Sequence, residues 1–323
     1  MLVQRRALLA APALLPLAAR AQSDWPQRPL TMMVPFVAGG PSDITARVIA
    51  AKMGAVIGQP VVVENRPGAT GAVAAQAMMR AAPDGYTMMT GSIGVFAINK
   101  ALRPNLPYDP ERDFAPITLA VTTPNVLVIN PQKIPATDFA GTMAWLRTNG
   151  ASASYSTSGV GSSEHMTMEL FKLRTRTEAT HIPYQGGSAA STALIGGDVQ
   201  LTFQNLSSVA GHLTSGRMRA VLVTSDVRNP TIPDVPTAAE VGLDDFVVTS
   251  WQAVMAHAAI PAPILARLEA ACIESLRHPE SMQRLQQIGF DVVASSAADF
   301  RRFQAAEIGR WRTVVDRAHI QAE

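Results

Sequence analysis

Residues 30–65 read LTMMVPFVAGGPSDITARVIAAKMGAVIGQPVVVEN, and this segment decides the fold of the N-terminal third. Its first apolar run, at 30–36, predicts a strand that ends in a Gly-Gly-Pro turn. From Asp43 onward, apolar side chains recur at helical spacing, and Gly58 suits the end of a helix. VVVEN at 61–65 predicts the next strand. This strand–helix–strand order indicates a mainly parallel sheet flanked by helices.

The same alternation continues along the chain. Further strands are expected at 86–90, 126–130, 151–157, 180–184, 199–205, 219–225 and 247–256, with helices between them and two or three helices at the end. We therefore expect an α/β fold of two lobes joined by two crossover strands, with a ligand cleft between the lobes. The expected boundaries are 22–123 for the first part of lobe I, 124–246 for lobe II, and 247–323 for the return of lobe I.

Residues 1–21 have the features of a signal peptide. Arg5 and Arg6 precede an apolar run that is short and contains two prolines, and Ala19-Arg20-Ala21 is a small-residue cleavage signal. The run is too short for a membrane-spanning helix, which needs about 20 apolar residues. We expect export and cleavage after Ala21, by either the general or the twin-arginine route.

Composition excludes several classes of protein. The chain has 323 residues, 47% apolar and 16% charged, as is usual for a globular protein. Its net charge is +2, but three arginines lie in the leader, so the remainder is nearly neutral and offers no electrostatic reason to bind nucleic acid. The single cysteine, Cys272, excludes a disulfide scaffold. It lies on an apolar helical stripe with Leu268 and Leu276, so we expect a buried, inert thiol.

Familiar catalytic and cofactor motifs are absent from the sequence. Gly159-Val160-Gly161 begins a dinucleotide-binding pattern, but Glu164 stands where the third glycine belongs. The six histidines are scattered, so we expect no metal and no cofactor. Ser162 or Ser163 beside His165 could form a nucleophile and base, but polar residues at a helix start are the favoured interpretation.

Glycine- and serine-rich loops follow several of the predicted strands. They lie at 39–43, 67–71, 91–94, 158–163 and 186–188. In an open α/β sheet such loops gather at the carboxyl edge, where helix N-termini offer free N–H groups to an anion. Each loop alone could be an ordinary turn or helix cap. As a set, they predict a cleft for a small carboxylate.

Three further residues have two interpretations each. Phe36 could form a wall of the cleft or belong to the core. Asn205, at a strand end, could point into the cleft or simply belong to a turn. Asp43 is expected to complement the dipole of the helix that it begins, with a contact to a ligand amino group as the alternative.

Longer motifs resemble a known family. They are Val34-Pro35-Phe36 with Gly39-Gly40 and Asp43, VVVENRPGATG at 61–71, APDGYT at 82–87, LPYDP at 106–110, DFAP at 113–116, PNVLV at 124–128, GSSEH at 161–165, HIPY at 181–184 with Gly186-Gly187, PDVPT at 233–237, and Ser250-Trp251. The chain resembles, over essentially all of its length from Trp25, the extracytoplasmic solute receptors of tripartite tricarboxylate transporters, the Bug family.

The resemblance implies a periplasmic binding protein of the type II fold that closes on a small carboxylate and presents it to integral membrane transporter subunits. We expect a monomer. The ligand-contacting residues that the resemblance implies are Phe36, Gly40, Ser42, Asp43, Ala69, Ser92, Ser158, Gly161, Ser162, Ser163, His165, Gly187, Ser188 and Asn205. Val37-Ala38 and Thr70 depart from residues common in the family, which leaves the identity of the carboxylate open.

Two alternatives remain. The same fold could serve as a sensory receptor for a membrane signalling partner, and the sequence does not separate sensing from transport. A secreted serine hydrolase that uses Ser162 or Ser163 with His165 is the other, and the missing nucleophile elbow argues against it. We expect a binding protein that is not an enzyme.

Overall fold

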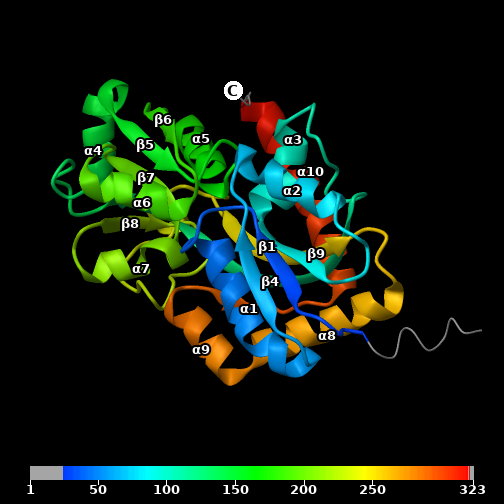
Figure 1. Ribbon diagram of the computed structural model, residues 1–323. Helices are drawn as coiled ribbons and strands as arrows, with labels where there is room; N and C mark the ends of the chain where they lie inside the picture. Colours follow the sequence, from blue (N-terminus) through cyan, green and yellow to red (C-terminus); the bar gives the residue numbers. More distant parts are fainter. Residues whose placement is uncertain (1–24, 319, 321–323) are drawn as a thin grey trace, which may run out of the picture.

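Two strands, β4 (Phe114–Ile129) and β9 (Thr249–His257), run through the middle of the molecule (Figure 1). The computed structural model describes residues 25–318 and residue 320, so the predicted signal peptide and its cleavage site lie outside the described residues. The strands are ordered β2-β1-β3-β9-β4-β7-β5-β6, and β8 and β10 each pair with β4 as well. The two-lobed α/β fold follows from the way β4 changes its partners.

The first lobe is built on the strands that lie on the β9 side of β4. Its remaining strands are β1 (Leu30–Val34), β2 (Val61–Asn65), β3 (Thr87–Ser92) and β10 (Asp291–Val292). Its helices are α1 (Pro41–Ile57), α2 (Ala72–Met79), α3 (Asn99–Leu102), α8 (Ala262–Arg277), α9 (Pro279–Gln287) and α10 (Ala297–Ala318), with a short π-helical segment, η3 (Gly94–Ile98), after β3. β1 pairs in parallel with both β2 and β3.

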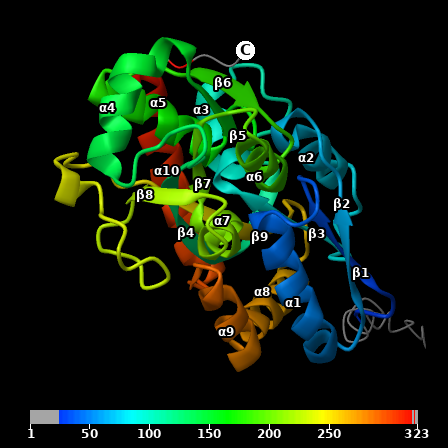
Figure 2. The same cartoon turned by 90° about the vertical axis from the view of Figure 1, so that its left-hand side faces the viewer.

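The second lobe lies on the other side. It contains β5 (Ser154–Thr157), β6 (Thr180–Pro183), β7 (Leu201–Asn205) and β8 (Arg219–Val223). Its helices are α4 (Phe139–Asn149), α5 (Ser163–Thr175), α6 (Gly187–Gly196) and α7 (Leu206–Thr214). β5 runs parallel to β6 and β7. Figure 2 shows α6 and α7 at the front of this lobe, with α4 and α5 higher up.

The prediction of a mainly parallel sheet is wrong for the centre of the molecule. β9 is antiparallel to both β3 and β4, and β4 is antiparallel to β7 and β8. The reason lies in the crossovers. A strand that leaves one lobe and a strand that returns to it must run in opposite directions to lie side by side.

β4 pairs with β9 from Phe114 to Pro124 and with β7 from Asn125 to Ile129. The strand therefore passes from one lobe to the other at the bond between Pro124 and Asn125. β9 starts at Thr249, after the chain has left β8, and runs back through the first lobe. These two passages bring residues that are far apart in sequence to the boundary between the lobes.

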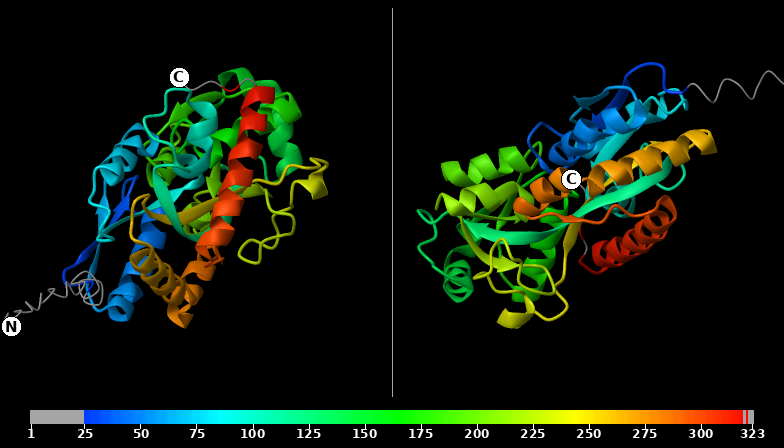
Figure 3. Two further views of the ribbon diagram at one scale, coloured as in Figure 1. Left: turned by 90° about the vertical axis from the view of Figure 1, so that its right-hand side faces the viewer. Right: turned by 90° about the horizontal axis from the view of Figure 1, so that it is seen from below.

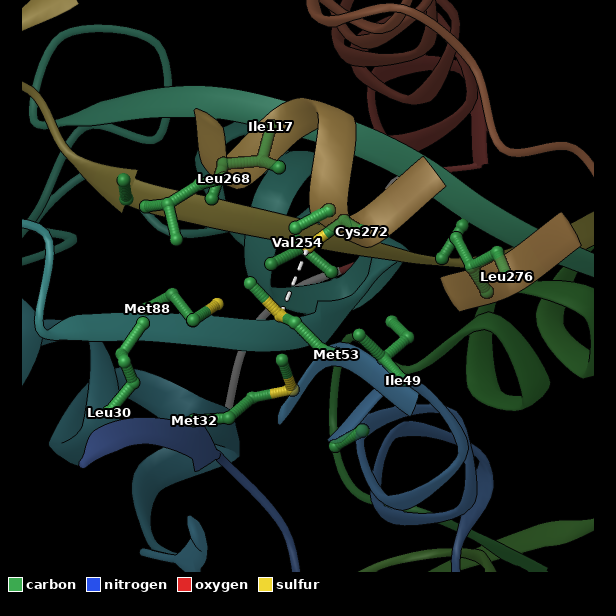
Figure 4. Packing of buried hydrophobic residues seen from close by; sticks show 14 of the residues in the cluster. Leu30, Met32, Ile49, Met53, Met88, Ile117, Val254, Leu268, Cys272 and Leu276 are labelled. Carbon is green, nitrogen blue, oxygen red and sulfur yellow. Dashed lines mark hydrogen bonds between the residues drawn. The ribbon is translucent and has the colours of Figure 1, made fainter. Parts of the chain in front are cut away.

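Helices cover both faces of the sheet in the first lobe. Figure 3 shows α8 and α10 on opposite sides of β4. One core cluster contains Met32, Met53, Met88 and Cys272 between the sheet and helices α1 and α8 (Figure 4). The thiol of Cys272 lies 3.9 Å from the sulfur of Met53, and burial raises the pKa of the thiol to about 12. The expectation of a buried Cys272 is confirmed.

The last helix, α10, begins with a capping serine. Ser296 Oγ accepts a hydrogen bond from the backbone N–H of Asp299 at 3.0 Å, and it donates to the Asp299 carboxylate at 2.6 Å. This exchange satisfies a helix-terminal donor and starts α10. Within residues 25–318, no helix combines the length and the apolar character needed to cross a membrane.

Candidate ligand-binding cleft

A cleft of about 410 Å³ lies between the lobes. Residues from both sides of the crossover line it: Phe36, Val37, Gly40, Pro41, Ser42, Ser92, Ile93, Ser158, Ser162, Ser163, Glu164, Gly186, Gly187, Asn205, Ser250 and Gln252. Small and hydroxyl-bearing side chains predominate, and Glu164 is the only one of them with an ionisable side chain. The lining thus leaves backbone groups and hydroxyls within reach of a ligand.

Four helices begin at this cleft. Their N-caps are Gly40 for α1, Ser162 for α5, Gly186 for α6 and Asn205 for α7, and all four residues line it. The first N–H groups of a helix have no acceptor within the helix, and the helix dipole places partial positive charge there. The convergence of four such ends makes a site for an anion that needs no lysine or arginine.

The loop that leads into α1 is braced by Asp43, which does not line the cleft. The Asp43 carboxylate accepts hydrogen bonds from the Gly39 backbone N–H, the Asn65 Nδ2 and the Arg47 Nε, each at 2.9 Å. Burial alone would raise the pKa of Asp43, but these bonds outweigh it and lower the pKa below its ordinary value. Asp43 is therefore an ionised brace that orients the Gly39–Ser42 backbone toward the cleft.

The side of the cleft formed by the first lobe is completed by β9. Ser42 Oγ donates to Gln252 Oε1 at 2.5 Å, a bond between residues 210 positions apart. Ser250 lies two residues earlier on the same strand and also lines the cleft. This bond holds the Ser42 hydroxyl and the Gln252 amide together at the cleft surface.

The loop before α5 is supported from behind by His165. Its Nδ1 accepts a hydrogen bond from the Gly161 backbone N–H at 3.2 Å, and its ring stacks on His181 with centroids 4.2 Å apart. Tyr155 stacks on the other side of His181 at 4.9 Å. Burial, the largest cause, lowers the pKa of His165 to about 4, so the ring is a neutral acceptor.

These contacts give Ser162 and His165 structural roles. Ser162 Oγ accepts from the backbone N–H of His165, as an N-cap residue does. The imidazole of His165 bonds to Gly161. Ser162 is therefore the N-cap of α5, the interpretation that the sequence favoured.

Glu164 is 3% exposed and lies at the start of α5. Its Oε1 accepts from Ser158 Oγ at 2.8 Å, and its Oε2 accepts from Ser163 Oγ at 3.3 Å. Burial is the largest influence and raises the pKa of the carboxyl above its ordinary value. A buried acid in a cleft otherwise suited to anions is the unexpected feature of the site.

The structure brings together nine of the fourteen residues proposed from the sequence. They are Phe36, Gly40, Ser42, Ser92, Ser158, Ser162, Ser163, Gly187 and Asn205. Five do not line the cleft: Asp43, Ala69, Gly161, His165 and Ser188. Asp43 and His165 brace the loops, and the Gly161 N–H is already bonded to His165. Ser188 faces the first lobe, since a methyl group at Gly39 would lie 3.3 Å from its hydroxyl oxygen.

Ala69 belongs to a second hollow, of about 690 Å³, that adjoins the cleft. Phe36 and Ser158 line both spaces. Arg103 lines this second hollow, and it reaches across the lobes to donate to the carbonyl oxygen of Val160 at 3.4 Å. The residues from loop 67–71 therefore lie outside the cleft proper.

Sequence reasoning missed seven lining residues. They are Val37, Pro41, Ile93, Glu164, Gly186, Ser250 and Gln252. Five of these adjoin residues that were proposed, so proximity in the loops was a usable signal. Ser250 and Gln252 carried a weaker signal, their place just after the expected boundary between residues 246 and 247, where the chain returns to lobe I. Glu164 was noticed as a departure from a glycine pattern and as part of the GSSEH motif, but it was not proposed as a lining residue.

Comparison with known proteins agrees with this geometry. The family model described as the tripartite tricarboxylate transporter family receptor matches residues 45–320. The chain belongs to this receptor family. Protein BugT of Bordetella pertussis is 35% identical over 301 residues, which cover 93% of this chain and 92% of BugT. The resemblance to the Bug family is thereby confirmed.

Solved structures of Bug-type receptors share the fold. A protein of R. palustris solved with adipate has a TM-score of 0.89 and 34% identity, over 92% of this chain and 99% of the other. MatC of Rhodopseudomonas palustris, solved with bound malate, has a TM-score of 0.86 and 33% identity, over 90% and 100%. The two-lobed receptor fold is confirmed, and this Bug-family chain is a solute-binding receptor.

Proposed function

We propose that this receptor captures a small carboxylate-bearing ligand in the cleft between its lobes, in the periplasm, and presents it to integral membrane subunits of a tripartite tricarboxylate-type transporter. The observation that carries the proposal is the meeting of four helix N-termini at a cleft whose lining residues include no lysine, arginine or histidine. An anion held there is bound by oriented N–H groups and hydroxyls.

The ligands of two relatives support the carboxylate class. One R. palustris relative is solved with adipate, and MatC is solved with malate. We infer that one carboxylate end of the ligand of this receptor lies at the helix N-termini. The contacts are proposed to come from Gly40 and Ser42 of the first lobe and from Ser158, Ser163, Gly187 and Asn205 of the second.

Further parts of the proposal concern the whole chain. We propose export through residues 1–21 with cleavage after Ala21, and action as a monomer. Residues 22–123 and 247–323 would form lobe I, and residues 124–246 would form lobe II. The change in the partners of β4 between Pro124 and Asn125 supports this division.

We propose binding without turnover. The bond from the Gly161 backbone to His165 Nδ1 supports the interpretation of His165 as a residue that holds the loop. The test is calorimetric titration of the protein with malate and with adipate, followed by chromatography of the recovered ligand. Saturable binding with the acid recovered unchanged supports a receptor. Conversion of either acid would contradict it.

A further inference from the structure

Glu164 gives the cleft a feature that a simple anion site does not need. It is the single ionisable side chain among the lining residues and is 3% exposed. Both of its carboxyl oxygens face serine hydroxyls, Ser158 at 2.8 Å and Ser163 at 3.3 Å. These serines also line the cleft, so the carboxyl and its partners lie together at the ligand surface.

The charged groups around Glu164 are engaged elsewhere. On its own helix, His165 stacks on His181, and Glu169 is paired with Lys172 at 2.8 Å. Across the cleft, the Asp43 carboxylate is paired with Arg47 at 2.9 Å. Beyond the second hollow, Arg103 donates to Asn99 and Val160. None of the cations in these pairs forms a described ion pair with Glu164.

An ionised Glu164 would therefore be a buried charge with no cation paired to it, beside a bound anion, and only serine hydroxyls and its own backbone N–H at the start of α5 would stabilise it. Burying a charge without a partner is costly, and a neighbouring carboxylate makes ionisation harder still. A neutral carboxyl has the opposite effect, because its O–H can donate to a ligand oxygen. Burial already raises the pKa of Glu164 in the protein without ligand.

We propose that Glu164 is a specificity-determining residue of the cleft, neutral in the complex, which donates its carboxyl proton to an oxygen of the bound carboxylate. This inference rests on the proposed function. The proton comes from solvent, stays on Glu164, and no covalent bond in the ligand changes. Capture of a carboxylate is thereby linked to the presence of one proton on the protein.

The proposal predicts which ligands the cleft rejects. A ligand that places an ammonium group against Glu164 needs the ionised form, whereas a carboxylate needs the neutral form. The matched test variant is Glu164→Gln. Its side-chain amide has nearly the same volume as a neutral carboxyl group, with one oxygen acceptor and an N–H donor that does not titrate. Glu178→Gln is the control, since Glu178 is exposed and lies outside the cleft.

The first experiment needs no ligand beyond a simple probe. The infrared difference spectrum between the protein and Glu164→Gln at neutral pH, with malate present, should contain the C=O stretch of a protonated carboxylic acid. Glu178→Gln should leave that band in place. If the malate complex contains no such band, Glu164 is ionised in it and the proposal is overturned.

The second experiment is calorimetric titration with malate and adipate from about pH 5 to about pH 9. Above the pKa of Glu164, affinity for whichever acid binds should fall about tenfold per pH unit, as proton linkage requires. Glu164→Gln should keep the affinity that the protein has at low pH and lose this pH dependence. A weaker Glu164→Gln complex at every pH would overturn the proposal, since it would mean that the ligand needs an anion.

The two proposals fail in different ways. If neither acid binds at any pH, these probes contradict the proposed function, and the role of Glu164, which rests on that function, is contradicted with it. If an acid binds with the same affinity at every pH and its complex lacks the infrared band, the receptor function stands and the role of Glu164 is overturned.

Discussion

Asn205, the N-cap of α7, donates from its Nδ2 to the Oδ1 of Asn125 on β4 at 2.6 Å. Asn125 is the first residue of β4 to pair with the second lobe, and its own Nδ2 donates to Thr167 Oγ1 on α5 at 2.7 Å. A residue that lines the cleft is thus tied to the strand that joins the lobes. Ligand contact and lobe geometry share one buried hydrogen-bond network.

Asn125→Ala tests this network. The substitution leaves buried amide and hydroxyl groups without their partner, so the free energy of unfolding should fall by about 1–3 kcal/mol. Ligand affinity should fall as well, although Asn125 does not line the cleft, because Asn205 loses its fixed orientation. Urea unfolding and calorimetry measure the two effects. Asn105→Ala, at an exposed position, is the control. Unchanged affinity in Asn125→Ala would show that Asn205 is positioned without it.

Gly94 tests lobe closure. A methyl group at this position would lie 3.1 Å from the carbonyl oxygen of Gly161, which belongs to the opposite lobe. The larger side chain of Gly94→Val should destabilise the arrangement in which the lobes are closed by about 1–3 kcal/mol. Because each 1.4 kcal/mol changes a binding constant about tenfold, ligand affinity should fall about fivefold to a hundredfold. Gly161→Val is a poorer test, because Gly161 has φ +81° and a β-branched residue would strain the backbone itself.

The measurement for Gly94→Val is ligand affinity together with the thermal stability of the protein without ligand. We expect weaker binding with little change in the unfolding temperature. Gly309→Ala, where the added methyl group meets open space on α10, should bind normally. Equal affinity for Gly94→Val and the native protein would mean that this contact is not part of the liganded state.

The stacked histidines predict a pH dependence of stability. Burial is the main cause that lowers the pKa of His165 to about 4 and of His181 to about 3. Both stay neutral in the folded protein while they gain a proton in the unfolded chain below about pH 6.5. Their contribution to stability is therefore full above about pH 6.5 and is lost as pH falls toward the folded pKa values.

Denaturant unfolding at several pH values measures this slope, with about 1.4 kcal/mol per pH unit expected for each histidine that stays neutral. His165→Asn can retain an acceptor for the Gly161 N–H and removes the titrating ring, so its slope should be smaller. The same slope in the variant and the native protein would contradict the account of His165.

Cys272 predicts an inert thiol. Its burial and its pKa of about 12 leave almost no thiolate at neutral pH. A chromogenic disulfide reagent should react with the protein only as fast as it unfolds, and promptly in denaturant. Stoichiometric reaction within seconds under native conditions would contradict the burial of Cys272, a residue of α8 that packs against Met53 of α1.

Much of the cleft could be predicted from the sequence because its chemistry is local. A glycine or serine after a strand marks a helix start, and Gly40, Ser162 and Gly187 all lie at such starts. The family resemblance put Gly161 and His165 at the ligand as well, whereas in the structure they bond to each other and do not line the cleft. Local sequence does not indicate which hydrogen-bonding groups of a loop are already bonded to neighbouring residues and are therefore not available to a ligand.

The rest of the site depends on contacts between distant segments. Ser42 meets Gln252 only because β9 returns beside β3 and β4 in antiparallel pairing. The apolar run at 247–256 predicts a strand, but it does not indicate whether that strand runs parallel or antiparallel to its neighbours. Glu164 is similar, because a glutamate at a helix start is expected to face solvent, whereas here it is 3% exposed and bonded to Ser158 and Ser163.

The most direct test of the central claim is a thermal-shift comparison of carboxylates with neutral amides of the same shape, on the protein from residue 22 onward. The panel would include malate, adipate, citrate, aspartate and glutamate. At about 100 times its dissociation constant, a bound acid should add about 2.7 kcal/mol of stability. We predict that at least one acid raises the unfolding temperature and that its amide does not. An amide that stabilises the protein as well as its acid would contradict recognition of the carboxylate by the four helix N-termini.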